Sequence, residues 1–212
     1  MDQPNDPKAP GEPSGRSEAT RAAILEGALR VFARLGFEAA STRVIAREAG
    51  VHHALLRYHF DNKDTLWREA ITAMFHRQRE EFAASQASSD VDPASLQGVK
   101  ESVRRYVRYC AAHPEHAAIL VHEAIADTPR LDWAVEQFIR SNAAGFTSRL
   151  SEHAPAGRLH LDPLLTGIIL SAASQMVFVL GPHLRRVFDQ DVLEPDFVER
   201  FADGLIAVMF KD

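Results

Sequence analysis

The sequence predicts an all-α protein, and three observations support this fold class. Apolar residues recur at spacings of three and four, as on one face of a helix, over most of the chain. The regions between these segments show no alternation of apolar and polar residues of the kind that marks a half-buried strand. Prolines stand at five irregularly spaced positions where helices are expected to begin: Pro93, Pro114, Pro129, Pro163 and Pro195. The irregular spacing argues against a repeat protein.

Length and composition favour one sizeable core with a small attached domain, because the chain has 212 residues, of which 46% are hydrophobic. The single cysteine, Cys110, excludes a disulfide framework and a four-cysteine zinc site, and it fits a reducing cytosol. The first 15 residues are rich in Pro, Asp and Gly and lack the apolar stretch of a secretory signal. We therefore expect a cytoplasmic protein with a disordered tail over residues 1–17.

The formal charge is divided unevenly along the chain. The whole chain carries −5 at pH 7, which by itself does not suggest a nucleic-acid-binding protein. Residues 19–63, however, hold seven basic and four acidic side chains, a charge of +3, whereas residues 1–18 carry −2 and residues 64–212 carry −6. A basic segment on an acidic body is expected when only one end of a molecule contacts phosphate.

Four helices are predicted in the first part of the chain. The first covers residues 20–35, with Thr20 as its N-cap and Gly36 in the left-handed position after its end. The second begins at a cap on Ser41 and stops at Gly50, and the third covers residues 51–60. A long fourth helix begins at Lys63, and residues 85–92 are the expected loop after it.

The second and third helices form a predicted helix-turn-helix over residues 41–60. A DNA major groove admits one helix, whose exposed side chains then meet base edges. Leu56 and Phe60 lie four residues apart and are expected to point inward. The side chains expected at base edges are His52, His53, Ala54, Arg57 and Tyr58, and those expected at phosphates or the groove rim are Ser41, Thr42, Arg43, His59 and Lys63.

Four features stand at fixed spacings within residues 20–68: Gly36–Ala39, Ile45–Val51, Tyr58–Phe60 and Lys63. Through them this segment resembles the TetR family of transcriptional regulators. The resemblance implies an N-terminal three-helix DNA-binding domain, here residues 18–78, and a larger helical domain for ligand binding and dimerisation, here residues 79–212. Family members mostly repress transcription and release operator DNA when a small molecule binds.

Several residues depart from the family pattern. Val44 stands where an acid usually completes the capping box behind Ser41, and Leu55 stands where a Thr commonly contacts phosphate. His52 and His53 replace small or charged residues, and Arg57 replaces a frequent Tyr. These changes lie on the face that reads DNA, so they are expected to alter operator preference while leaving the fold unchanged.

The helix predicted from Pro163 is uncharged as far as Pro182 and apolar on nearly every face. Its length suits a membrane span, but its Thr, Ser, Gly and Gln residues favour a helix buried in protein. Gly167, Ser171 and Ser174 would let another helix approach closely. We predict a homodimer through residues 163–181 and 195–210, with burial of both helices inside a monomer as the alternative.

Four residues, His113, His116, His122 and Glu123, raise the question of a metal site, but surface and helix-terminus histidines explain them and no metal or cofactor is expected. The adjacent pair His52 and His53 points about 100° apart on a helix, which also disfavours a metal there.

Other side chains of the larger domain have simpler interpretations. Lys100, Arg104 and Arg108 form a stripe that is expected to be solvated and paired with acids, and Cys110 is expected to be a small buried hydrophobe. A ligand pocket would draw on Phe and Leu residues together with Tyr106, Tyr109 and Trp133.

These features predict a dimeric regulator that binds near-palindromic operator DNA and is released from it by a small apolar ligand. A transcriptional activator of the same fold, or a helical scaffold that binds other proteins and not DNA, are the alternatives. An enzyme is not expected, because the sequence has no nucleophile elbow, phosphate loop or zincin motif.

Overall fold

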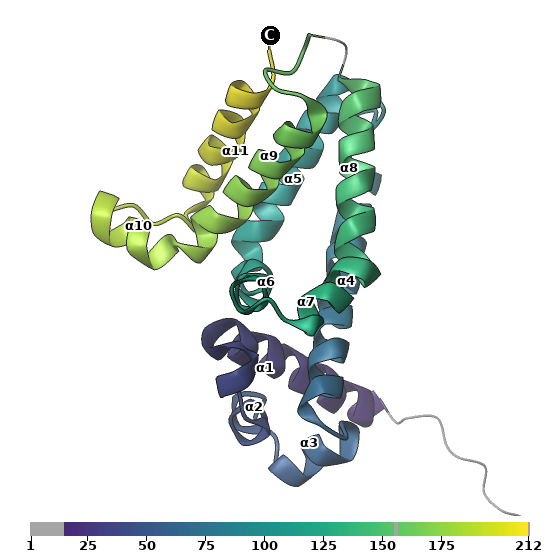
Figure 1. The fold of residues 1–212 in the computed structure, drawn as a ribbon, viewed down its shortest axis with the longest axis vertical. Coiled ribbons are helices and arrows are strands. Elements are labelled where there is room, and N and C mark those ends of the chain that lie inside the picture. Colours follow the sequence, from purple (N-terminus) through teal and green to yellow (C-terminus); the bar gives the residue numbers. More distant parts are fainter. Residues whose placement is uncertain (1–14, 155–156, 212) are drawn as a thin grey trace, which may run out of the picture. The chain divides into compact units, whose positions relative to one another are not determined.

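The computed structural model describes residues 15–154 and 157–211, except for the side chain of residue 16. Over these residues the regular elements are helices, with one isolated bridge between Leu159 and Phe210, so the predicted all-α class is confirmed. Two compact units divide the chain between Ala70 and Ile71. The helices are α1 (Gly15–Ala39), α2 (Thr42–Glu48), α3 (His53–His59), α4 (Lys63–Ala87), α5 (Leu96–Ala112), α6 (Pro114–Ala126), α7 (Pro129–Ala134), the π-helix η1 (Val135–Ile139), α8 (Arg140–His153), α9 (Pro163–Val179), α10 (Gly181–Phe188) and α11 (Pro195–Met209) (Figure 1).

The first unit packs α2 and α3 against α1 around a core of fully buried side chains, among them Phe32, Ile45, Leu56 and Phe60. The contact between α1 and α2 is close because Gly27 has no side chain. A Cβ atom built on it would lie 2.9 Å from Cβ of Ala49, at the end of α2. No sequence pattern indicated a role for this glycine, yet it determines how closely α2 packs against α1.

Two helix starts in this unit differ from the prediction. The first helix begins at Gly15, ahead of the predicted cap at Thr20, since no proline lies between Pro13 and Thr20 and Glu18 suits the first turn. Residues 15–17 of the predicted tail are therefore helical, and residues 1–14 lie outside the described residues. The third helix begins at His53, because the N–H of Val51 donates to the carbonyl of Ala46 (2.9 Å) and closes the end of α2.

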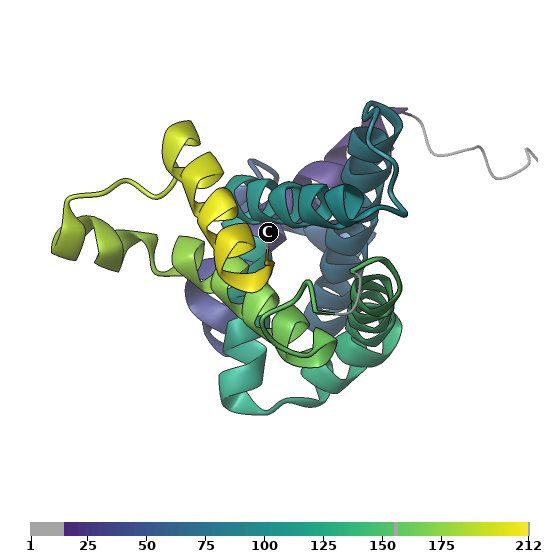
Figure 2. The ribbon, with the colours of Figure 1, turned by 90° about the horizontal axis from the view of Figure 1, so that it is seen from above.

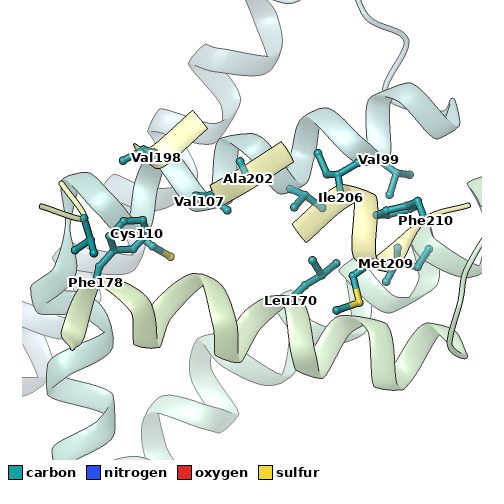
Figure 3. Packing of buried hydrophobic residues seen from close by; sticks show 13 residues of the cluster. Val99, Val107, Cys110, Leu170, Phe178, Val198, Ala202, Ile206, Met209 and Phe210 are labelled. Atoms are coloured by element: carbon teal, nitrogen blue, oxygen red, sulfur yellow. The ribbon is translucent and has the colours of Figure 1, made fainter. Parts of the chain in front are cut away.

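The larger unit is built around α5, α9 and α11, which lie side by side (Figure 1) and are seen from above in Figure 2. Figure 3 shows their buried side chains meeting in one core. That core contains Val99, Val103, Val107 and Cys110 of α5, Leu170 and Phe178 of α9, and Val198, Ala202, Ile206 and Met209 of α11. The residues from α5 and from α11 recur at the three- and four-residue spacing of one helix face, and Leu170 and Phe178 lie eight residues apart on α9.

Four of the five predicted proline starts are confirmed: Pro114, Pro129, Pro163 and Pro195 lie in the first turns of α6, α7, α9 and α11. The start at Pro93 is wrong. Asp92 accepts a hydrogen bond from the N–H of Ala94 (3.0 Å) and forms a turn, and Ser95 instead caps α5 by accepting from the N–H of Gly98 (3.0 Å). The fourth helix, from Lys63, extends into the predicted loop as far as Ala87.

The helix α9 is buried along one stripe only, formed by Thr166, Leu170, Ser174 and Phe178. The small-residue stripe lies against the same chain: a Cβ atom on Gly167 would lie 3.5 Å from Oγ1 of Thr147 in α8. Among the described residues no single helix is long and apolar enough to cross a membrane, although α9 and α10 together pass that test as a pair bent by 73°.

The helix α10 was not predicted as a separate element. Its proline, Pro182, lies in its first turn, and it extends away from α5, α9 and α11 in both ribbon views (Figure 1, Figure 2).

Candidate DNA interface and interior cavity

The third helix presents one face to the core and the other to solvent. Leu56 and Phe60 are 1% and 2% exposed, whereas Tyr58 is 80% exposed. Arg57, like His52 and Ala54, is exposed as well. The side chains predicted to meet base edges are therefore accessible, apart from His53, which is half-buried.

A hydrogen bond that the sequence did not indicate joins the two helices of the motif. Oγ1 of Thr42, the first residue of α2, lies 3.0 Å from Nε2 of His53, the first residue of α3. Both helix starts also carry side-chain caps, since Ser41 Oγ accepts from the N–H of Val44 (3.3 Å) and His52 Nδ1 accepts from the N–H of Ala54 (3.3 Å). The cap on Ser41 forms even though Val44 cannot complete a capping box.

Ion pairs divide the arginines of this unit into two groups. Arg30 and Arg34 of α1 both donate to the carboxylate of Glu48 on α2, at 3.0 and 3.4 Å, and the bond from Arg30 is the main cause that lowers the pKa of Glu48. Arg21 pairs with Glu69. Arg43, Arg47 and Arg57 are exposed and form no ion pair with any side chain in the described part of the chain.

The exposed arginines that form no ion pair among the described residues of this unit thus lie on α2 and α3. Arg47 belongs to this group although it was not among the predicted contacts. A charge count along the sequence could not separate it from the arginines that pair with carboxylates.

Lys63 is engaged within the protein. Its ammonium donates to the carbonyl oxygens of Phe37 (2.8 Å) and Glu38 (3.4 Å) and lies 4.1 Å from the centre of the Phe37 ring. These bonds tie the start of α4 to the end of α1. His59, also predicted to contact phosphate, is half-buried and its ring packs edge-on against that of Tyr58, with centroids 5.3 Å apart.

The larger unit contains a cavity of about 1000 Å³ that is partly open to solvent and lies between α4, α5, α6, η1, α8 and α9. Its apolar wall includes the rings of Phe75, Phe82, Tyr106, Phe138 and Phe146. Of the aromatic residues that the sequence suggested, Tyr106 lines this cavity, whereas Tyr109 lines a separate pocket of about 10 Å³ and Trp133 lines neither.

Polar groups on one wall of the cavity are held in place. Nε2 of Gln175 donates to the hydroxyl of Tyr106 (2.9 Å) and to Oγ of Ser171 (2.8 Å). Burial is the main cause that raises the pKa of Tyr106, so this phenol stays protonated at neutral pH. Three arginines, Arg79, Arg105 and Arg149, also line the cavity.

The histidines that raised the question of a metal site do not form one, and the described residues contain no group of three potential ligands. His113 bonds to Glu81 through Nε2 at 3.1 Å. The sequence suggested that His116 is a surface or helix-terminus histidine, and this prediction is wrong. The helix α6 turns the side chain inward against Phe75 and Tyr109. Burial, aided by the positive charge of Arg77, lowers the pKa of His116 to about 3.

Two residues of the basic stripe on α5, Arg104 and Arg108, pair with acids, as predicted, whereas the ammonium of Lys100 lies over the Phe210 ring. Arg104 contacts Asp203 of α11 (2.9 Å), and Arg108 contacts Glu199 of the same helix (2.7 Å). Cys110 is buried, as predicted, and burial raises the pKa of its thiol to about 12. The stripe therefore helps attach α11 to α5.

Comparisons with known proteins agree with these features. Residues 24–70 match the family model described as bacterial regulatory proteins, tetR family. The HTH-type transcriptional regulator RutR of Escherichia coli O157:H7 is 28% identical over 205 residues, which cover 96% of this chain and 95% of RutR. The HTH-type transcriptional repressor SCO4008 of Streptomyces coelicolor is 31% identical over 131 residues, which cover 60% of this chain and 63% of the repressor.

Solved structures share the fold. The ketosteroid transcriptional regulator KstR2 of Mycobacterium tuberculosis superposes with a TM-score of 0.68 at 18% identity, covering 97% of this chain and 100% of that one. The matched segment, residues 24–70, contains the whole helix-turn-helix with its exposed arginines. The helix-turn-helix segment of this chain therefore matches the tetR family model, and the chain, which is similar to RutR over nearly its whole length, is a DNA-binding transcriptional regulator.

Proposed function

We propose that this regulator is a repressor that binds a near-palindromic operator as a homodimer and releases it when a small molecule with an apolar body fills the cavity. One observation carries the proposal. A single helix, α4, begins four residues after α3 ends and also supplies Phe75, Gln78 and Phe82 to the cavity wall. A ligand that moves α4 would therefore act on the element that follows the reading helix.

The proposed DNA contacts follow from exposure and charge. Arg57 would donate two guanidinium N–H groups to O6 and N7 of a guanine, with His52, His53, Ala54 and Tyr58 at neighbouring base edges. Arg43 and Arg47 would bind phosphates, since they are exposed and unpaired within the described part of the chain. Ser41, Thr42 and His59 would lie at the groove rim.

The ammonium of Lys63 has three N–H donors, and two of them are used by the carbonyl oxygens of Phe37 and Glu38. Lys63 would therefore bind phosphate with the one donor that remains. We call the helix-turn-helix, residues 41–60, the reading head. The first role of Lys63 is to hold the start of α4, the helix that follows the reading head, to α1.

The proposed dimer uses the faces of α9 and α11 that the single chain leaves open. Leu165 and Ile169 of α9 are exposed, and Val208 of α11 is 64% exposed. On α10, which the sequence did not predict, Phe188 is 68% exposed. Large apolar side chains exposed on neighbouring helices are typical of a protein interface. A two-fold dimer would place two reading helices about 34 Å apart, or a multiple of that, on DNA.

The proposed domain boundary lies within α4. The sequence suggested a DNA-binding domain over residues 18–78 and a regulatory domain over 79–212, and the compact units meet at Ala70 and Ile71 on the same helix. A continuous helix through a domain boundary suits a regulator in which ligand binding and DNA binding are coupled.

Selection of bound duplexes from a random pool tests the proposal. We expect a two-fold symmetric motif, binding that weakens steeply with salt, and release of the selected DNA when a cavity ligand is added. A motif without symmetry would contradict the dimer, and absence of binding at low salt would contradict DNA recognition. Ligand-induced tightening on the selected DNA would instead favour the activator alternative.

A further inference from the structure

The cavity of the larger unit is positively charged. Its lining includes Arg79 of α4, Arg105 of α5 and Arg149 of α8, and no Asp or Glu occurs among the described residues that line it. The remaining charged candidate, His116, is held neutral by burial, which lowers its pKa to about 3. The arginines are therefore the only ionised groups on the described wall at neutral pH.

Arg105 is a buried cation with neutral partners. Its residue is 9% exposed, its Nε donates to Oγ of Ser85 (2.9 Å), and its Nη1 donates to Oε1 of Gln86 (3.1 Å). No carboxylate within the described ranges pairs with it. A guanidinium has five N–H groups, so these two bonds leave three donors for another partner.

Arg149 lies near the same charge. Its Nη1 donates to Oγ of Ser102 at 3.4 Å, and its guanidinium carbon lies 5.8 Å from the centre of the Phe146 ring. Burial is the first cause that lowers the pKa of Arg149, and the positive charge of Arg105 is the second. Two guanidinium groups thus repel each other in a partly desolvated place without a carboxylate between them.

This arrangement differs from that of four other arginines in the larger unit. Arg77, Arg104, Arg108 and Arg130 each form an ion pair with a glutamate or aspartate. Buried charge is costly unless it is paired, so the two unpaired guanidiniums in the cavity indicate that an anion completes the site. The planar fork of a guanidinium matches an oxyanion with two oxygens in one plane.

We propose that the effector is an organic acid, with an oxyanion head bound by Arg105 and Arg149 and an apolar body against the phenylalanine rings of the cavity. The inference rests on the proposed function and names the chemical class of its ligand. Phe75, Phe82 and Phe138 supply the apolar wall, while Arg79 adds positive charge on α4. A volume of about 1000 Å³ lies at the upper end for small-molecule sites, which suits a bulky or long-chain acid.

The test compares three probes of the same shape on the full chain by calorimetry: 4-octylbenzoate, the neutral 4-octylbenzamide and the cationic 4-octylbenzylammonium. We expect the anion to bind about 10- to 100-fold more tightly than the amide, and the cation to bind most weakly. Equal binding of acid and amide, or preference for the cation, would overturn the inference.

Substitutions then test which arginines bind the oxyanion head of the ligand. Arg149→Gln should remove most of the preference for the acid over the amide. The matched control Arg104→Gln lies on the neighbouring face of α5, pairs with Asp203 outside the cavity, and should retain the preference. If Arg149→Gln still prefers the acid over the amide, the assignment of Arg149 is overturned. If this variant does not fold, the binding of the three probes to the unmodified chain still decides the ligand class.

The same samples separate the two proposals. If the protein binds duplex DNA, and 4-octylbenzamide releases that DNA as well as 4-octylbenzoate does, the regulatory function stands and the anion site is overturned. Tight binding of the acid without any DNA binding at low salt would support the site and contradict the proposed function.

Discussion

The buried imidazole of His116 predicts a specific loss of stability in mild acid. His116 is 8% exposed, its Nδ1 lies 3.2 Å from the Tyr109 hydroxyl, and its ring packs edge-on against Phe75 with centroids 4.7 Å apart. The folded protein therefore favours the neutral ring, and the pKa of His116 falls from 6.5 to about 3. The unfolded chain accepts the proton first, so stability declines as the pH drops below 6.5 and stops declining near 3.

The magnitude follows from proton linkage. Between about pH 7.5 and about pH 5.0 an unfolded histidine goes from mostly neutral to almost fully protonated, which lowers the free energy of unfolding by about 2 kcal/mol. The folded-state pKa of about 3 lies well below this interval, so the result depends almost entirely on the ordinary value of 6.5.

The assay is urea unfolding at both pH values with His116→Asn beside the unmodified protein. Asparagine keeps a polar atom near the position of Nδ1 and does not titrate in this interval. The variant should lose packing against Phe75 at both pH values. We therefore compare the change between the two pH values, which should be smaller in the variant by about 2 kcal/mol. Protein concentration is held fixed, because a dimer's stability depends on it.

His76→Asn serves as the control, because His76 lies on the exposed face of α4. This control should reproduce the pH dependence of the unmodified protein. If His116→Asn showed the same pH dependence as the unmodified chain, His116 would not be held neutral in the fold, and the reasoning from its burial would be refuted.

Three further substitutions test the reading head and the dimer. Arg57→Ala should cost about 1–3 kcal/mol of operator binding and relax base preference at one position in each half-site; an unchanged selected motif would remove Arg57 from the base contacts. Gly50→Ala should destabilise the protein by about 1 kcal/mol in thermal unfolding, because Gly50 has a positive φ of 69° that alanine disfavours. The added Cβ would meet no atom within 4 Å, so the strain would lie in the backbone alone. Val208→Asp should shift the protein toward monomer in sedimentation, because it would bury an unpaired charge in the proposed interface; a dimer of unchanged affinity would place the interface elsewhere.

Local chemistry explains why the reading head was predictable. Leu56 and Phe60 point inward because they lie four residues apart on a short helix, and Ser41 caps α2 through a bond to the third residue after it. The start of α3 was placed two residues early, because the bond from Val51 to Ala46 that ends α2 is not visible as a periodic pattern. Such interactions span a few residues, so the sequence carries nearly all the information they need.

The sequence by itself determined the helical class, the position of the helix-turn-helix and the exposed face of α3, because periodicity and capping act over one or two turns. Only the tertiary structure decided which cations are free. Glu48 forms ion pairs with Arg30 and Arg34, whereas Arg43 and Arg57 are exposed and form no ion pair among the described residues. Which arginines are paired depends on how α1 meets α2. The cavity, whose described lining residues include no Asp or Glu, likewise brings together Arg105 and Arg149 from two helices. Whether a charge is paired depends on neighbours in space that the order of residues does not specify.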